Sequence, residues 1–180
     1  MNKMFNSFAE VFSYPVIDYQ KNTAELGKQI DVDEENRQKY DEFIKYVERT
    51  ELSDIEELFT RSFDMNPLTC LEIGWHLYGE DYQRGEFLVK MRQSLEEFKI
   101  TESVELPDHL SHCLKLMAVL ESDEVQIFSE NYLLPAIGKI LKNFSGDNPY
   151  KPVIEILKYV IDEKYASSGK MSGDRVSAQV

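Results

Sequence analysis

Apolar residues recur along this chain at the spacing of an α-helix. Phe5, Phe8 and Phe12 follow one another at intervals of three and four residues, and similar sets recur in segment after segment. Side chains at this spacing share one helix face, whereas a half-buried strand alternates apolar and polar residues. No stretch alternates for long enough to suggest a strand. The sequence therefore predicts an all-α protein, a helical bundle of about eight to ten helices.

Local signals predict where several helices begin and end. Ser53 with Glu56 matches a capping box, and Pro107 is expected in the first turn of another helix. Asn66-Pro67 and Asn148-Pro149 each resemble an N-cap followed by a proline at the first helical position. The remaining signals are Pro15 as the end of the first helix, an apolar stripe over Asp33–Thr50, Gly79 as a left-handed helix end, a helix at about Tyr82–Lys99, Pro135 in the first turn of a helix or kinking it, and a broad apolar face from Val153 to Ile161.

The length of 180 residues is that of one domain with a tail. A hydrophobic content of 42% with 12% aromatic residues is typical of a folded core. Residues 166–180 (ASSGKMSGDRVSAQV) contain no aromatic side chain, which favours disorder. We therefore expect a helical domain over residues 1–165 and a flexible tail over residues 166–180.

The chain is strongly acidic, with 33 acidic and 20 basic residues and a net charge of −13. Eleven acidic residues and four basic ones lie between Asp31 and Glu57. Such a surface repels nucleic acid and anionic lipid and attracts cationic peptide, although acidity also simply keeps proteins in solution. No run of about 18 apolar residues is present, and the N-terminal segment does not resemble a secretory signal. We expect a cytoplasmic protein without membrane insertion and without a nucleic-acid partner.

Residues that could carry out catalysis or bind metal are few. Cys70 and Cys113 are expected to be free, buried thiols. His109, His112 and Cys113 could share one helix face as zinc ligands, but no further ligand has a spacing that ties it to them. Nucleotide-binding loops and nucleophile motifs are missing from the sequence. The sequence thus favours a protein that is not an enzyme and that has neither a metal nor another cofactor.

Two short segments concentrate polar and aromatic side chains beside helix ends, His76–Gly85 (HLYGEDYQRG) and Glu105–Leu110 (ELPDHL). Each can be explained as an ordinary turn, with Glu80 pairing with Arg84 one helical turn later. That explanation assigns no role to the aromatic residues beside the first turn. Aromatic residues with polar groups often anchor interfaces. From the residues alone, a plain turn and a binding site are both open.

Four motifs in order make the chain resemble the nitrate reductase delta-subunit (NarJ-type) family of assembly chaperones for molybdoenzymes. This family lies within the wider group that also serves trimethylamine oxide and dimethyl sulfoxide reductases. The matching stretches are Phe12–Pro15 (FSYP), Leu58–Asn66 (LFTRSFDMN), His76–Gly85 with the FLVKMRQ that follows, and Glu105–Leu110, and the run from Leu116 to Val160 resembles the C-terminal helices of the family.

The resemblance implies an all-α cytoplasmic chaperone that binds the N-terminal segment of a molybdopterin-containing catalytic subunit. Such a protein holds that segment for molybdenum cofactor insertion and for assembly or export. We expect the chain to be a monomer or a weak homodimer. The peptide-binding residues expected by position are Trp75, His76, Tyr78, Glu80, Tyr82, Arg84, Glu105, Asp108 and His109. Two other functions stay open: an acidic helical adaptor for an unrelated basic partner, and a small metal-dependent hydrolase that uses His109 and His112.

Overall fold

The computed structural model describes residues 3–144 and 146–166, whose regular elements are helices and one isolated β-bridge. This confirms the predicted all-α fold. The α-helices are α1 (Lys3–Val11), α2 (Tyr19–Gln29), α3 (Glu34–Arg49), α4 (Leu52–Phe59), α5 (Ile73–Tyr78), α6 (Tyr82–Glu97), α7 (Leu110–Met117), α8 (Ser122–Phe128), α9 (Leu134–Asn143) and α10 (Tyr150–Ile161). Short π-helical segments follow α4, α8 and α10, at Thr60–Asp64, Ser129–Leu133 and Asp162–Ala166. The predicted tail lies outside the described residues, apart from its first residue.

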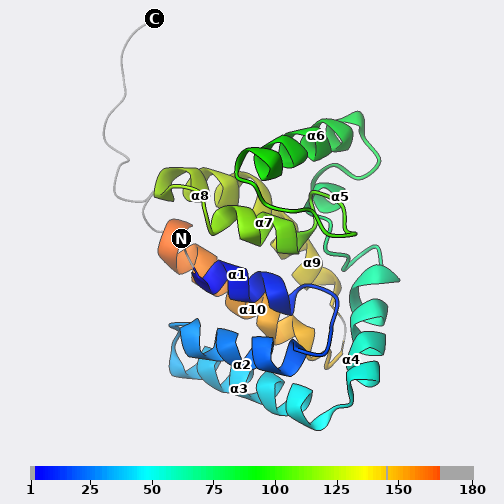
Figure 1. Ribbon diagram of the computed structural model, residues 1–180, viewed down its shortest axis with the longest axis vertical. Coiled ribbons are helices and arrows are strands. Elements are labelled where there is room, and N and C mark those ends of the chain that lie inside the picture. The colour runs from blue at the N-terminus through cyan, green and yellow to red at the C-terminus, as the bar shows by residue number, and fades with distance from the viewer. Residues whose placement is uncertain (1–2, 145, 167–180) are drawn as a thin grey trace, which may run out of the picture.

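Helix α10 runs through the middle of the molecule, behind α1 in the view of Figure 1. It packs against α3 on one side and α9 on the other, while α1 packs against α2 and α7. Helices α2 and α3 form the lower end in Figure 1, and α6 lies at the upper end above α7 and α8. The broad apolar face that the sequence predicts for the last helix is buried on several sides, from Val153 to Ile161.

Aromatic side chains fill the centre of the core around Tyr150. The Tyr150 ring centroid lies 5.0 Å from that of Phe63 and 5.7 Å from that of Phe59. The buried Tyr19 hydroxyl donates to the carbonyl of Val11 at 2.8 Å and lies 3.1 Å from the Tyr150 hydroxyl. These contacts hold the beginning of α2 and the end of α1 against α10, since each hydroxyl is satisfied inside an apolar setting.

Several predicted helix ends are confirmed. Gly79 follows α5 with a φ of 60°, and its backbone N–H donates to the carbonyl of Trp75. Pro135 lies in the first turn of α9, directly after the π-helical segment Ser129–Leu133. Asn148 Oδ1 accepts a hydrogen bond from the backbone N–H of Tyr150, the first residue of α10, although Pro149 and not Asn148 occupies the N-cap position.

Other predicted starts are wrong. Helix α4 begins at Leu52 with Glu51 as its N-cap, so Ser53 and Glu56 form no capping box there. Asn66 and Pro67 begin only a turn, in which the Asn66 side chain accepts from the backbone N–H of Leu68, and α5 starts later at Ile73. The sequence also did not predict α2 and α8. Helix α2 is mostly polar and buries only Tyr19, Thr23 and Leu26, so its apolar stripe is too weak to recognise.

Candidate functional site

The two segments that the sequence singles out are brought together by a short backbone pairing. Glu72 and His109 form an antiparallel bridge. On either side of it, the N–H of Ile73 donates to the carbonyl of Asp108 at 3.0 Å, and the N–H of Leu110 donates to the carbonyl of Leu71 at 2.8 Å. The entrance of α5 and the entrance of α7 therefore form one structural unit.

This pairing overturns the predicted role of Pro107. Pro107 and Asp108 lie in a turn, and α7 starts at Leu110 with His109 as its N-cap. The His109 ring nitrogen Nδ1 accepts from the backbone N–H of Ser111 at 3.3 Å. Asp108 and His109 lie before the helix, because the carbonyl of Asp108 and the N–H of Leu110 are paired with Ile73 and Leu71 on either side of the bridge.

Asp108 is completely buried at the centre of this unit. Its Oδ2 accepts from the backbone N–H of Gly74 at 2.9 Å, while its Oδ1 has no hydrogen-bond partner among the described residues. Burial raises the pKa of Asp108, against the effects of the Gly74 hydrogen bond and the charge of Arg84. The carboxyl group thus has a structural role, anchoring the start of α5.

Arg84 reaches this unit from the first turn of α6. Its guanidinium carbon lies 5.3 Å from the centre of the Trp75 ring, a cation–π arrangement. The predicted ion pair between Glu80 and Arg84 is not among the contacts of the described residues. The Arg84 Nε atom is buried without a hydrogen-bond partner there. Arg84 therefore links α6 to α5 through an aromatic face and not along its own helix.

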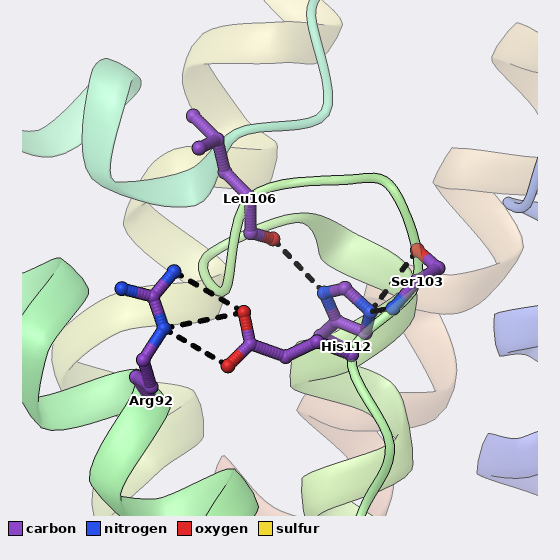
Figure 2. Close-up of polar contacts among 5 residues, drawn as sticks. Arg92, Ser103, Leu106 and His112 are labelled. Carbon is purple, nitrogen blue, oxygen red and sulfur yellow. Dashed lines mark hydrogen bonds and ion pairs between the residues drawn. The ribbon is translucent and has the colours of Figure 1, made fainter.

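The loop before Asp108 is fixed at two points, which Figure 2 shows. His112 on α7 accepts from the backbone N–H of Ser103 through Nε2 at 3.0 Å, and its Nδ1 lies 2.9 Å from the carbonyl oxygen of Leu106. Arg92 on α6 forms an ion pair with Glu102 at 3.0 Å. The loop is therefore held against both helices.

The two histidines of this region are held neutral by their surroundings. Burial lowers the pKa of His109 to about 3, with the charges of His112 and Lys115 adding to the effect. Burial also lowers the pKa of His112. Both rings are engaged by protein groups, and in residues 3–144 and 146–166 no three His, Cys, Asp or Glu side chains are grouped to hold a metal ion.

The other predicted contact residues differ in accessibility. Trp75 and His76 are partly buried and hold α5 in place, with Trp75 Nε1 donating to the Pro67 carbonyl at 2.9 Å and His76 Nε2 lying 2.7 Å from the Cys70 carbonyl oxygen. Tyr78 and Glu105 are also partly buried, whereas Glu80 and Tyr82 face solvent. Tyr82 is 81% exposed, so it contributes nothing to the core and is available to a partner.

Three carboxylates gather beside the bridge, although only Glu105 belongs to the predicted set. Burial raises the pKa of Glu105, and repulsion from Asp64 and Glu72 adds to the effect. Exposed apolar side chains stand next to these acids in the chain: Met65 beside Asp64 and Leu106 beside Glu105. This combination gives the surface an acidic and apolar character, which sequence analysis missed because Asp64 and Glu105 lie 41 positions apart.

An apolar groove of about 260 Å³ lies between α6, α7 and α8. Its apolar lining consists of Phe87, Met91, Leu116, Leu120, Ile127, Phe128 and Tyr132, with Lys90, Ser94 and Glu124 among them. Phe87 connects the groove to the bridge region, because its ring packs against Tyr78 and Tyr132 and also lies beside Gly74. The sequence places these residues on apolar helix faces. Because such faces ordinarily pack into the protein core, the sequence does not indicate an exposed groove.

The two thiols are free, as predicted. Cys113 is completely buried, and Cys70 is partly buried. Burial raises the pKa of Cys70 to about 12 and places that of Cys113 well above its ordinary value. Neither thiol is therefore activated as a nucleophile.

Comparison with known proteins identifies a family. Residues 29–145, more than half of the chain, match the family model described as the nitrate reductase delta subunit. The matched range contains the bridge, the acidic side chains beside it and the apolar groove. No curated protein matches the chain. Among the helices of the described residues, none has both the length and the apolar character to span a bilayer.

Proposed function

Because the chain belongs to the nitrate reductase delta subunit family, whose members are assembly chaperones of molybdoenzymes, we propose that it serves one molybdopterin oxidoreductase. It binds the N-terminal segment of the catalytic subunit and holds it, in the cytoplasm, until the molybdenum cofactor is inserted. The chaperone binds its client in a stoichiometric complex and catalyses no reaction.

The apolar groove between α6, α7 and α8 is the observation that carries this proposal. Ile127 lines the groove and is 59% exposed, and Leu120 and Tyr132 are only partly buried. Exposed apolar surface that is gathered in a groove suits the apolar face of a peptide helix. Lys90 and Glu124 provide polar contacts in the same lining.

The bridge region supports the groove from one end. Phe87 lies between the groove and Gly74, so the Asp108 hydrogen bond to Gly74 helps to position a groove wall. The same bridge region contains the cation–π pair of Trp75 and Arg84 and the neighbouring acids Glu72 and Glu105. A client segment with apolar and basic residues would contact the apolar groove with its apolar side chains and the acids beside the bridge with its basic ones.

Charge affects how such a complex forms and dissociates. The net charge of −13 speeds encounter with a cationic segment and makes the association rate sensitive to salt. Ordering a flexible segment costs about 2–5 kcal/mol of the interaction energy. Binding by this mode is reversible, as an assembly chaperone requires.

Affinity purification with the tagged full-length chain from extracts of its own cells tests the proposal. We expect a molybdopterin-type catalytic subunit to co-purify, and its recovery to be lost when its N-terminal segment is deleted. Titration calorimetry with a synthetic peptide of that segment should then give one peptide per chain. Recovery of unrelated basic proteins alone, released at moderate salt, would instead identify an acidic adaptor.

A further inference from the structure

A second apolar surface lies at the loop between α1 and α2, which continues the FSYP motif. Val16 is 54% exposed and Ile17 is 87% exposed, whereas Phe12 and Pro15 in the motif itself are buried. Two adjacent aliphatic side chains at this exposure are unfavourable in water unless a partner covers them. The groove between α6, α7 and α8 contains neither of them.

The loop presents these two side chains in a fixed position. The ring of Tyr14 packs edge-on against the buried ring of Phe59, with 5.8 Å between centroids. The backbone N–H of Tyr19 donates to the carbonyl of Val16 at 2.8 Å, and the Tyr19 side chain is itself buried. Contacts on both sides therefore hold the loop, and the exposure of Ile17 does not result from a loose chain.

Val16 and Ile17 form one wall of a hollow of about 230 Å³. The opposite wall is the corner where α3 ends and α4 begins, with Glu48, Glu51 and Leu52. Buried Ile55 contributes to its lining. The Gln20 side chain donates to the carbonyl of Val47 at 3.2 Å, which fixes α2 against α3 at this point.

The lining of the hollow is acidic on balance, because it contains two carboxylates and one arginine. Glu48 and Glu51 line it, both are exposed, and neither forms an ion pair within the described ranges 3–144 and 146–166. Glu51 is the N-cap residue of α4, yet its side chain makes no capping hydrogen bond. Arg49 is the basic side chain in the lining. The carboxylates are therefore available to a cationic partner, while anionic lipid and nucleic acid are disfavoured.

We propose that this hollow is a second docking surface, whose occupant is a polypeptide segment that carries an aliphatic side chain flanked by Lys or Arg. The aliphatic side chain packs against Val16, Ile17 and Leu52, and the basic groups pair with Glu48 and Glu51. The hollow lies at the lower end of the molecule in Figure 1, where α3 meets α4, and α6 lies at the upper end. The chain can therefore bind a client in the groove and a second basic segment here at the same time.

Fluorescence anisotropy with two labelled peptides tests this surface on the full-length chain. One peptide consists of Lys and Leu, and the other has Glu in place of every Lys. We expect only the Lys–Leu peptide to bind, and Ile17→Ser to raise its Kd about tenfold, equivalent to about 1.4 kcal/mol. Glu48→Gln with Glu51→Gln should raise the Kd at low salt and reduce its dependence on salt.

Matched variants separate this hollow from general effects. Val104→Ser removes an aliphatic side chain that is 98% exposed elsewhere, and Asp41→Asn with Glu97→Gln removes two exposed acids outside the hollow. Both should leave the Kd unchanged, and unchanged thermal unfolding of every variant should show that the fold is intact. The proposal is overturned if the Glu–Leu peptide binds equally well or if Ile17→Ser leaves the Kd as it was. It is also overturned if Ile127→Ser in the other groove abolishes binding of the Lys–Leu peptide.

Discussion

The carboxylate of Asp108 accepts a hydrogen bond from the backbone N–H of Gly74, with 2.9 Å between oxygen and nitrogen. The two residues are 34 positions apart in the sequence. Gly74 lies in the first turn of α5, and Asp108 lies just before the start of α7. This contact joins α5 to the entrance of α7. It converts two separate polar segments of the sequence into one buried unit beside the apolar groove.

Asp108→Ala should destabilise the fold by about 1–3 kcal/mol, because the buried N–H of Gly74 loses its partner. Asp108→Asn keeps an acceptor oxygen at this position and should cost less. Urea unfolding of the two variants measures the difference. If both unfold like the natural protein, the hydrogen bond to Gly74 contributes nothing to the stability of the fold.

Gly74→Ala should also destabilise the fold. A Cβ atom on residue 74 would lie 2.7 Å from Asp108 Oδ2 and 2.9 Å from Phe87 Cδ1, so the carboxyl group or the groove wall would have to move. Gly138→Ala in α9 is the control, since nothing lies within 4 Å of the added atom there. That control should stabilise by about 0.5–1 kcal/mol, as expected for Gly to Ala within a helix. Equal melting temperatures for the two variants would contradict the close packing around Gly74.

Ile127→Ser should weaken binding of the client segment about tenfold, because an aliphatic side chain is lost from the groove. Val89→Ser is its matched control, since Val89 on α6 is 55% exposed against 59% for Ile127 but does not line the groove. Titration calorimetry with the client peptide compares the two variants. A similar loss of affinity in both would place the peptide elsewhere on the surface.

Trp75 is the one tryptophan of the sequence, so its fluorescence reports directly on the bridge region. If the client segment reaches Trp75 and Arg84, adding the peptide should shift the emission to shorter wavelength as water is displaced. The same peptide should bind more weakly to Tyr82→Ser, because Tyr82 is exposed and free to contact it. Binding in calorimetry without any change in emission would exclude Trp75 from the contact surface.

Acid should destabilise the protein through His109. Burial lowers the pKa of His109 from 6.5 to about 3 in the folded chain, whereas the unfolded chain takes up the proton near pH 6.5. The unfolded state therefore binds more protons in this range, and stability falls as the pH drops from 6.5 toward 3, by up to about 1.4 kcal/mol per pH unit for this group. The raised pKa of Asp108 acts in the opposite direction in the acidic part of the range.

His109→Asn isolates the histidine contribution, since Asn is also a good N-cap residue and does not titrate. Urea unfolding of both proteins at several pH values should show a shallower loss of stability in the variant below pH 6.5. Parallel pH profiles for the two proteins would mean that His109 takes up its proton equally well in the folded state.

The helical period determined most of the architecture from the sequence alone. Helices α6 and α10 were predicted from their own side chains, because an apolar stripe must be buried whatever it packs against. Gly79 was predicted to close α5 because few other residues adopt a positive φ at low energy. The two polar segments were singled out by their composition, which is unusual for a loop, and the bridge between Glu72 and His109 brings them together.

Only the tertiary structure decided where several helices begin and which residues meet. Pro107 and Pro67 satisfy the local rules for a helix start, yet the backbone at Ile73 and Leu110 is paired across the bridge, and α5 and α7 begin only there. A local signal cannot anticipate a hydrogen-bond partner about forty residues away. For the same reason, the groove between α6, α7 and α8 and the hollow beside Ile17 could not be predicted. Both depend on the faces that packing leaves uncovered, whereas the sequence specifies only which faces are apolar.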